Sequence, residues 1–397
     1  MSHPEADPIV IVAAQRTPIG AFQGQLSSLA APQLGAAAIA GAMRQAGVPL
    51  DEVDEVLMGC CLMAGLGQAP ARQALLGAGL PASVPATTLT KMCGSGMKAV
   101  MLAHDMIKAG SATVMVAGGM ESMSNAPYLL PTARAGQRLG HGSMIDHMFF
   151  DGLQDAYDGE LMGHHAEAMA QEQGINRTTQ DDFARESVRR AQWAVESGAF
   201  KDEITPVTLA TRQGEQTVSD DETPGKCQPA KIATLKPAFG AQGSITAASS
   251  ASISDGAAAL VLTRDSIARQ RGWTPLARIV AHSTHAAEPA RFPSAPVGAI
   301  VGLMQRTGWS NKDVDLYEIN EAFAMVTLIA QRTLGLDPDK VNVHGGACAL
   351  GHPIGATGAR ILVSLLHALR QRSLKRGVAS LCIGGGEATA MALELID

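Results

Sequence analysis

Aromatic side chains are scarce in this 397-residue sequence. Tryptophan, tyrosine and phenylalanine together make up 4% of it, whereas glycine occurs 42 times. We therefore expect a core that packs through the close approach of small residues rather than through aromatic contacts. No window approaches about 18 consecutive apolar residues, so the sequence predicts no membrane-spanning helix. The polar, acidic residues 1–7 lack the apolar stretch of a signal or transit peptide, and none is expected.

The sequence also has no excess of basic residues, since its formal net charge is −6. Nucleic acids and anionic membrane surfaces attract clustered positive charge, so we expect neither as a partner. A small anionic ligand would need a local basic patch within this acidic chain.

Cysteine is too sparse for a disulfide framework. The six cysteines lie far apart, except for the adjacent pair Cys60 and Cys61. Without a secretion signal, this pattern favours reduced thiols and a cytoplasmic location. Neither Cys60-Cys61 nor His164-His165 has the spacing of metal ligands, and the glycine run 384–386 lacks the helix and acidic residue of a dinucleotide-binding motif. We therefore expect no metal ion and no redox cofactor.

Strand-like and helix-like segments alternate along the chain, which indicates an α/β fold with a largely parallel sheet. The length predicts two or three domains. Glycines at positions 47 and 110 end two of the helices. The predicted strands are 9–13, 53–59, 113–117, 315–319 and 379–383, and the predicted helices are 34–46, 94–109, 180–197 and 322–334.

The second half of the chain repeats the order of the first. Residues 31–56 parallel 295–317, and residues 93–119 parallel 356–385. The copies are long and only two in number, which excludes an array of short repeats. The sequence therefore predicts two α/β units that pack together.

A different segment, about 122–246, separates the two copies. It is rich in methionine, histidine and charge, and in its helix 180–197 the preceding Thr178 and Thr179 are capping candidates. Its polar stretch 220–231 indicates an exposed loop, and the segment suits a lid or a ligand-binding insertion. The predicted domains are 1–121 plus 247–274, then 122–246, and then 275–397.

Cys93 is the first candidate for chemistry. It stands just before Gly94-Ser95-Gly96 and a predicted helix, where unpaired N–H groups and the helix dipole favour a thiolate. The glycines would let a ligand approach the backbone closely. On its own, the pattern also fits a small buried cysteine with an inert sulfur.

Three further segments offer complementary groups. His352 precedes Pro353 on a stiff loop and could take a thiol proton, although it could also be a turn histidine without a partner. Cys382 ends an apolar strand before three glycines, where it could move a proton at carbon, unless it is only a core cysteine. Asn320 ends a strand-like run and could hold a water molecule at a thioester oxygen, but it could equally cap the following helix.

Four motifs together resemble the thiolase family over essentially the whole chain. They are Cys-Gly-Ser-Gly-Met-Lys at 93–98, Asn-Glu-Ala-Phe at 320–323, Gly-His-Pro at 351–353 with its glycines to 358, and Cys-Ile-Gly-Gly-Gly at 382–386. The resemblance implies a layered α-β-α-β-α core of duplicated halves with an inserted, coenzyme A-binding loop domain. It implies a homo-oligomer, either dimer or tetramer, that uses acyl-CoA and CoA as substrates and needs no cofactor.

The resemblance also assigns roles to the candidate residues. Cys93 would carry the acyl group, His352 would activate the Cys93 thiol, and Cys382 would act as acid and base at the α-carbon. His352 and a water on Asn320 would form one oxyanion site, and the backbone N–H groups of Cys93 and Gly384 the other. The acyl-CoA contacts that it implies are Met162, Leu235, Phe239, Ala247, Ser250, Phe292, Ala322 and Phe323.

Several positions depart from the common family pattern. Leu161 replaces a usual histidine, Ser249-Ser250-Ala251 replaces Asn-Ala-Ser, and His344 stands where asparagine is common. Phe292-Pro293 is similar to short-chain thiolases that accept 2-methyl-branched acetoacetyl-CoA. Val188 takes the place of the tyrosine through which those enzymes use potassium, so potassium activation is not expected.

These observations predict a short-chain acetyl-CoA C-acetyltransferase. It would condense two acetyl-CoA molecules, or cleave a 3-oxoacyl-CoA with CoA, by a ping-pong route through acyl-Cys93. A longer-chain 3-ketoacyl-CoA thiolase of β-oxidation is the second enzymatic hypothesis. A non-catalytic acyl-CoA-binding paralogue is the alternative from another class.

Overall fold

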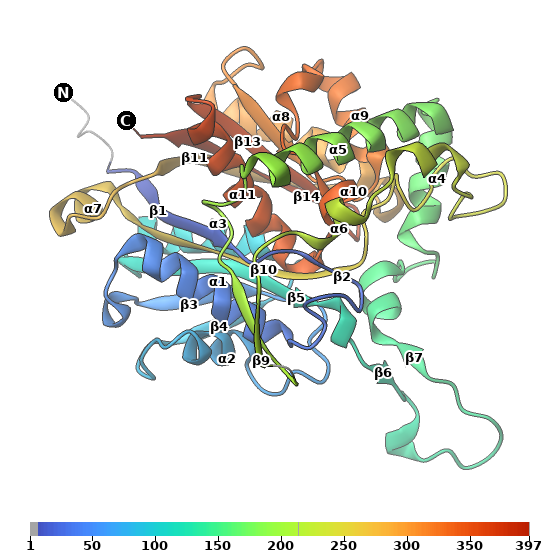
Figure 1. Cartoon of the computed structure of the whole chain (residues 1–397), viewed down its shortest axis with the longest axis horizontal. Coiled ribbons are helices and arrows are strands. Elements are labelled where there is room, and N and C mark those ends of the chain that lie inside the picture. The colour runs from blue at the N-terminus through green and yellow to red at the C-terminus, as the bar shows by residue number, and fades with distance from the viewer. Residues whose placement is uncertain (1–6, 213, 397) are drawn as a thin grey trace.

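The computed structural model describes residues 7–212 and 214–396. Ten strands form one mixed sheet, built from two halves that Figure 1 separates by colour, with the blue and cyan strands of the first half below the orange and red strands of the second. Helices lie between the halves and on both outer faces. The expected α-β-α-β-α layering is confirmed by the way the hydrophobic core divides.

The first half supplies one side of the sheet. In spatial order its strands are β4 (Ala86–Leu89), β3 (Glu55–Gly59), β5 (Val114–Ser122), β10 (Ser254–Arg264) and β1 (Ile9–Arg16), with β2 (Gly20–Ala21) beside β10. Side chains of β1 alternate between layers, as strand geometry requires. Ile9 and Ile11 contact the central helices, whereas Val10 and Val12 contact the outer ones.

The second half repeats this arrangement. In spatial order its strands are β12 (Leu316–Ile319), β13 (Arg376–Ile383), β14 (Glu387–Leu395) and β11 (Ala277–Ala286). The pairings correspond, since β3–β5 and β12–β13 are parallel, whereas β5–β10 and β13–β14 are antiparallel. The halves meet where β1 pairs with β11 at Val10–Arg278 and Ile11–Ala277.

The expectation of a largely parallel sheet is wrong. Among the described strands of this sheet, only β3–β4, β3–β5 and β12–β13 pair in parallel. Sequence periodicity identified the strands but not their direction. In each half, one strand is followed by a partner that pairs with it in the opposite direction. In the second half, for example, β14 reverses direction after the Gly384–Gly386 turn and pairs antiparallel with β13.

Two helices form the central layer, α3 (Ser95–Ala109) and α11 (Ile354–Gln371). Every residue of α11 from Ile354 to Leu369 is buried. The helices cross at glycines, because a Cβ atom on Gly358 would lie 2.4 Å from the Met97 nitrogen and one on Gly96 would lie 2.8 Å from the Ala359 nitrogen. The expectation of close packing between small residues is confirmed at this crossing.

The outer helices cover the two remaining faces. On the first half, α1 (Ala31–Ala46), α2 (Pro70–Gly77) and α7 (Asp265–Arg271) enclose one core. On the second, α8 (Ala295–Thr307) and α9 (Ala324–Leu334) enclose another. Gly47 and Gly110 end α1 and α3 in the left-handed region, at φ of 63° and 79°, as predicted. No described helix is long and apolar enough to cross a membrane.

The segment between the halves carries its own elements and a protruding arm. The arm holds the hairpin of β6 (Tyr128–Leu129) and β7 (Ile145–Asp146), which Figure 1 shows extending away from the body. The remaining elements are η4 (Phe149–Leu153), α4 (Met162–Glu172), α5 (Arg177–Ser197), β8 (Val207–Thr211), β9 (Gly214–Val218), α6 (Glu222–Lys226) and η5 (Pro229–Thr234). Short helical turns elsewhere in the described chain are η1 (Leu50–Glu52), η6 (Pro289–Ser294), η7 (Pro338–Lys340) and α10 (Ala347–Leu350), and two more, η2 (Met123–Asn125) and η3 (Ala133–Ala135), lie in the inserted segment.

Two local predictions need correction. The cap of α5 is Asn176, whose Oδ1 accepts the N–H of Thr179 at 3.0 Å, so neither Thr178 nor Thr179 is the cap. The helix α9 begins at Ala324 with Phe323 as its N-cap residue. Asn320 therefore does not cap it, and the structural alternative for that residue is excluded.

The segment 220–231, predicted as an exposed loop, is exposed or partly exposed at most of its positions, but Asp221 within it belongs to a buried ion cluster. Arg16 lies between Asp221, with its Nη1 atom 2.7 Å from Oδ1, and Glu203, with its Nε atom 2.5 Å from Oε1, and all three side chains are fully buried. The Arg16 guanidinium also covers the Phe200 ring at 4.8 Å. The cluster ties the inserted segment to β1, and its partners lie about 200 residues from Arg16, beyond the reach of local sequence patterns.

Candidate active site

One cavity lies where the central helices, the β13–β14 turn and the inserted segment meet. Cys93, His352, Cys382 and Gly384 all line it. These four residues come from three distant parts of the sequence. The predicted convergence of two thiols and one imidazole is therefore present.

Cys93 lies in a tight turn immediately before α3. Met92 adopts φ of 46°, a conformation that side-chain-bearing residues rarely occupy and that is often found at functional sites. Ser95 closes the turn, because its hydroxyl accepts the N–H of Lys91 at 2.8 Å and donates to the Met92 carbonyl at 2.6 Å. Burial raises the pKa of the Cys93 thiol to about 11, against the effect of the backbone N–H groups of Gly384 and of Cys93 itself. The resting group is thus a thiol that needs a base.

His352 has the tautomer that such a base requires. The Thr357 hydroxyl donates to the Pro353 carbonyl at 3.0 Å, so its oxygen is free to accept a hydrogen bond from the N–H of His352 Nδ1 at 2.7 Å. Nε2 then carries the lone pair, and it has no protein hydrogen-bond partner among the described residues. Burial, and secondarily the charge of Arg360, lowers the pKa of His352 to about 3, so the ring is neutral near pH 7.

Cys382 sits next to the C-terminal end of β13 and is 1% exposed. Burial, together with the neighbouring Cys93 sulfur, raises the pKa of its thiol well above the usual value. The following turn places Gly385 and Gly386 at φ of 90° and 88°, which favours glycine. This turn aims the Gly384 N–H at the Cys93 sulfur, where negative charge develops during acyl transfer.

Asn320 follows β12 and is held by its backbone N–H, which donates to the Ser380 carbonyl at 2.9 Å. Its side chain is buried, and neither Oδ1 nor Nδ2 bonds to a described protein group. Asn320 is not among the residues that line the cavity, although Ala322 and Phe323 of the same motif are. Its polar atoms remain available for a bound water or substrate.

Most of the acyl-CoA contacts implied by the family resemblance meet at this cavity. Six of the eight line it, whereas Leu235 and Ala247 do not. The cavity wall is aromatic despite the scarcity of such residues, since four of the eight phenylalanines lie there. The ring centroids of Phe239 and Phe323 are 5.9 Å apart, and those of Phe292 and Phe323 are 6.3 Å apart. The six are Met162, Phe239, Ser250, Phe292, Ala322 and Phe323.

The sequence interpretation missed Glu121, which is buried near the end of β5. Its carboxylate accepts the N–H groups of Cys61 at 3.0 Å, Leu62 at 3.1 Å and Gly355 at 2.9 Å. Burial raises its pKa despite these donors. Glu121 thus fixes the loop after β3 to the start of α11 beside His352. Only its place at a strand end hinted at this role.

Glu321 has a similar positioning role on the other side. Its carboxylate accepts hydrogen bonds from Ser187 Oγ at 2.7 Å, Asn342 Nδ2 at 2.9 Å and the Cys348 N–H at 3.0 Å. It therefore joins α5 of the inserted segment to the loop that leads to His352. Lining residues that sequence analysis did not single out include Phe149, Gly152, Leu153, Ile253 and Ile354.

The duplicated fold and this cavity define a class of protein: an enzyme that transfers acyl groups. The family models agree, since "Thiolase, N-terminal domain" matches residues 9–266 and "Thiolase, C-terminal domain" matches residues 273–395. The chain is 48% identical over 387 residues to an acetyl-CoA acetyltransferase of Pseudomonas aeruginosa, covering 97% of this chain and 98% of that protein. It is 50% identical to one of Escherichia coli, covering 98% and 99%.

A solved structure gives the same result for the fold. The Bacillus anthracis acetyl-CoA acetyltransferase superposes with a TM-score of 0.96 at 42% identity, covering 98% of this chain and 99% of that one. The chain therefore belongs to the thiolase family and is an acyltransferase.

Proposed function

We propose that this enzyme is a short-chain acetyl-CoA C-acetyltransferase, which condenses two acetyl-CoA molecules to acetoacetyl-CoA and CoA or runs the reverse thiolysis. The observation that carries the proposal is the neutral His352 ring, with Nε2 unpaired, in one cavity with both thiols. The relatives named above are acetyl-CoA acetyltransferases. CoA and its thioesters serve as substrates, and the residues assigned here require no metal or cofactor for the chemistry.

In the first half-reaction, His352 Nε2 takes the Cys93 proton. The thiolate attacks the acetyl carbonyl, and the backbone N–H groups of Cys93 and Gly384 stabilise the oxyanion. The carbon–sulfur bond to CoA then breaks, and the proton on His352 passes to the departing CoA sulfur. Because the pKa of Cys93 is raised to about 11, the base and the oxyanion donors must act together.

In the second half-reaction, the Cys382 proton passes to His352 Nε2, and the thiolate that remains removes an α-proton from another acetyl-CoA. The resulting enolate attacks the acetyl carbon on Cys93, and Cys93 leaves as a thiolate that takes the proton from His352. Burial, together with the neighbouring Cys93 sulfur, keeps the pKa of Cys382 high. A Cys93 thiolate would oppose ionisation of Cys382, and acylation prevents that thiolate from forming, so Cys382 ionises more easily in the acyl-enzyme. The protonated His352 ring and a water on Asn320 would stabilise the enolate oxygen.

Mass spectrometry after incubation with acetyl-CoA tests the covalent step. We expect an acetyl adduct on the peptide that contains Cys93, and none in the Cys93→Ala variant. Binding of CoA without any adduct on that peptide would instead support a non-catalytic acyl-CoA-binding protein.

A second variant separates the two half-reactions. Cys382→Ser should still form the acetyl adduct on Cys93 but should lose most condensation activity, at least about 100-fold, because serine is a far weaker acid and base at carbon. Rapid-quench measurement of adduct formation, followed by steady-state assay, gives both rates. Equal loss of both steps would refute the role assigned to Cys382.

Substrate size is the finer part of the proposal. Phe292 and Phe323 are 2% and 8% exposed and wall the cavity, which favours a short acyl group. Val188 is buried with Ile19 and Ala191 in an apolar cluster, which offers no oxygen ligand for potassium there. Turnover of acetoacetyl-CoA should exceed that of long-chain 3-oxoacyl-CoAs, and 2-methylacetoacetyl-CoA should be accepted. The reverse chain-length order would favour a β-oxidation thiolase.

We further propose a cytoplasmic homo-oligomer. The arm between β6 and β7 exposes Tyr128, Leu130, Leu139 and Met144, of which Leu139 is 99% exposed. An apolar arm that reaches away from the body suits contact with another copy of this chain. The six cysteines are free thiols, which fits a reducing compartment. Light scattering of the purified protein would give the number of chains.

A further inference from the structure

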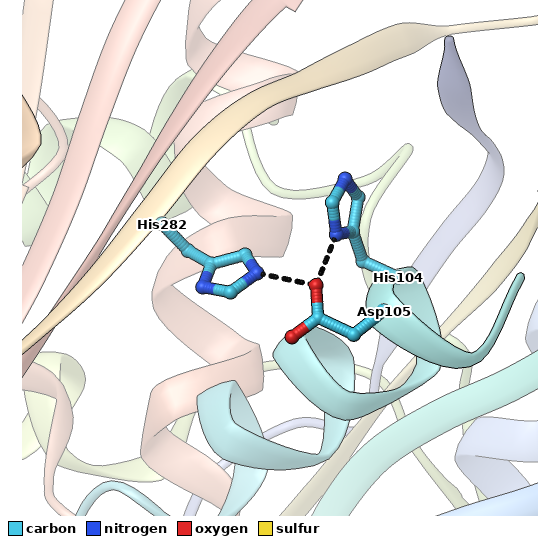
Figure 2. Close-up of side chains that lie close together, drawn as sticks. All are labelled: His104, Asp105 and His282. Atoms are coloured by element: carbon cyan, nitrogen blue, oxygen red, sulfur yellow. Dashed lines mark hydrogen bonds and ion pairs between the residues drawn. The ribbon is translucent and has the colours of Figure 1, made fainter. Parts of the chain in front are cut away.

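Two histidines and one aspartate converge on a single point away from the catalytic cavity. Figure 2 shows Asp105 between the rings of His104 and His282, with one carboxylate oxygen facing both. Asp105 Oδ1 lies 2.9 Å from His104 Nδ1 and 3.0 Å from His282 Nε2. The three atoms all lie within 4.8 Å of one another. We propose that His104, Asp105 and His282 bind one divalent transition-metal cation of the Zn²⁺ type.

The donor set suits such a cation. Zinc binds imidazole nitrogen and carboxylate oxygen at about 2.0–2.2 Å, which sets neighbouring ligand atoms of a tetrahedral site roughly 3.3–3.6 Å apart. The observed separations of 2.9 and 3.0 Å need only a small outward movement to reach this range. Two imidazoles with one carboxylate are a common set for Zn²⁺ and related ions, whereas Ca²⁺ and Mg²⁺ prefer oxygen ligands.

The surroundings hold the imidazoles and leave room for water. The side chains of His104 and His282 are 10% and 14% exposed, whereas that of Asp105 is 54% exposed. Arg306 Nη1 donates to the His282 carbonyl at 2.7 Å and so fixes the backbone of β11 there.

The position in the fold indicates a structural role. His104 and Asp105 belong to α3 of the first half, and His282 belongs to β11 of the second. A bound ion would therefore link the two halves. Ser95, the first residue of α3, follows Cys93 by two residues, and the helix rises about 15 Å from Ser95 to Asp105 at 1.5 Å per residue, so the cluster is separate from the acyl-transfer site.

A second group of possible ligands is weaker. Asp155, Asp158 and His165 also place three ligand atoms close together. However, Asp155 Oδ1 already accepts the N–H groups of Tyr157 at 2.8 Å and Asp158 at 3.3 Å. That group also has one imidazole rather than two, and it lies within the inserted segment. It therefore supplies the control substitution for the metal-binding experiment.

Metal binding to the full-length protein tests the proposal. After dialysis against a chelator, Zn²⁺ is added and binding is followed by calorimetry and metal analysis. We expect one Zn²⁺ per chain that raises the thermal unfolding midpoint, and at least about 100-fold weaker binding in Asp105→Asn and in His282→Gln, since even outer-shell changes cost 10–100-fold. The matched control Asp158→Asn should bind as the parent protein does.

Cobalt distinguishes this site from the thiols of the active site. Co²⁺ at the proposed cluster should give visible absorption bands without a thiolate charge-transfer band. Unchanged zinc affinity in Asp105→Asn, loss of binding in Asp158→Asn instead, or a thiolate band with Co²⁺ would each overturn the proposal. Asp105 is half-exposed and its asparagine variant keeps the side-chain shape, so we expect that variant to fold and to retain acyl transfer.

Discussion

At the scale of single residues, the Thr357 hydroxyl determines which nitrogen of His352 carries the proton. It donates to the Pro353 carbonyl and can therefore only accept from His352 Nδ1. No residue that ionises near neutral pH takes part in this orientation. Thr357 is a positioning residue that acts through the imidazole.

Replacing Thr357 with valine should slow acylation of Cys93 about 10–100-fold. The valine keeps the shape but removes the acceptor, which leaves Nδ1–H buried and unpaired at a cost of about 1–3 kcal/mol. Stopped-flow measurement of CoA release should show a lower rate constant with little change in KM.

Thr357→Ser is the matched control, because it restores the hydroxyl group. Its acylation rate should return to near the parent value, and the pH profile of acylation should match that of the parent. A serine variant as slow as the valine variant would point to lost packing rather than to lost orientation of the imidazole.

Residue patterns predicted the reactive groups better than the residues that position those groups. Cys93, His352 and Cys382 stand in glycine-rich motifs that leave room for a ligand, and such motifs are readable in one sequence. Glu121 could not be found in this way, because its donors come from residues near 61 and 355 and meet only in the folded chain. Glu121 was not predictable because its hydrogen-bond partners are distant in sequence, and not because its carboxylate makes few hydrogen bonds.

At the scale of elements, the contact between α3 and α11 determines where Cys93 stands. The two helices approach at Gly96 and Gly358, where any Cβ would meet the backbone of the other helix. Because α3 begins just after Cys93 and α11 begins just after His352, their separation also sets the distance between thiol and imidazole.

Gly358→Ala should therefore reduce both stability and activity. The added Cβ would lie 2.4 Å from the Met97 nitrogen, and overpacking of this kind costs about 1–3 kcal/mol or more. Urea unfolding gives the stability change, and the acylation rate should fall even where the variant is fully folded. The control is Gly225→Ala in α6, where a Cβ meets nothing within 4 Å and alanine should be neutral or stabilising.

Helices and their ends were more predictable than the sheet. The ends of α1 and α3 follow from the left-handed glycines at 47 and 110. Strand direction did not follow, because periodicity is the same in parallel and antiparallel strands. The cap of α5 was placed two or three residues too late, since Asn176 and the neighbouring threonines are all good capping residues.

At the scale of the whole molecule, buried histidines make the stability of the fold depend on pH. His344 is enclosed by Trp193 and Phe200, each with a ring centroid 5.8 Å away. Burial lowers its pKa to about 4 from 6.5. Between these values the unfolded chain binds more protons than the folded chain, so this contribution to stability is lost as the pH falls from about 6.5 to about 4.

His344→Asn should flatten the acid side of the stability curve. Comparing the free energy of unfolding at pH 7 and pH 4.5, we expect the variant to lose about 2 kcal/mol less than the parent protein. Glu318, whose pKa is raised by burial to about 8, changes stability in the opposite direction in both proteins and so cancels from the comparison. An identical loss in both proteins would show that His344 is not the group responsible.

The central place of β1 also constrains how the protein is made. This strand is synthesised well before its partners, since Ile9 pairs with Arg264 and Val10 pairs with Arg278. A nascent chain therefore carries β1 as an unpaired apolar strand until about 240 further residues, which bring the chain to its partner β10, have been synthesised, and such edges promote aggregation. Efficient production of this enzyme should accordingly depend on chaperones that shield β1 until β10 and β11 have been made.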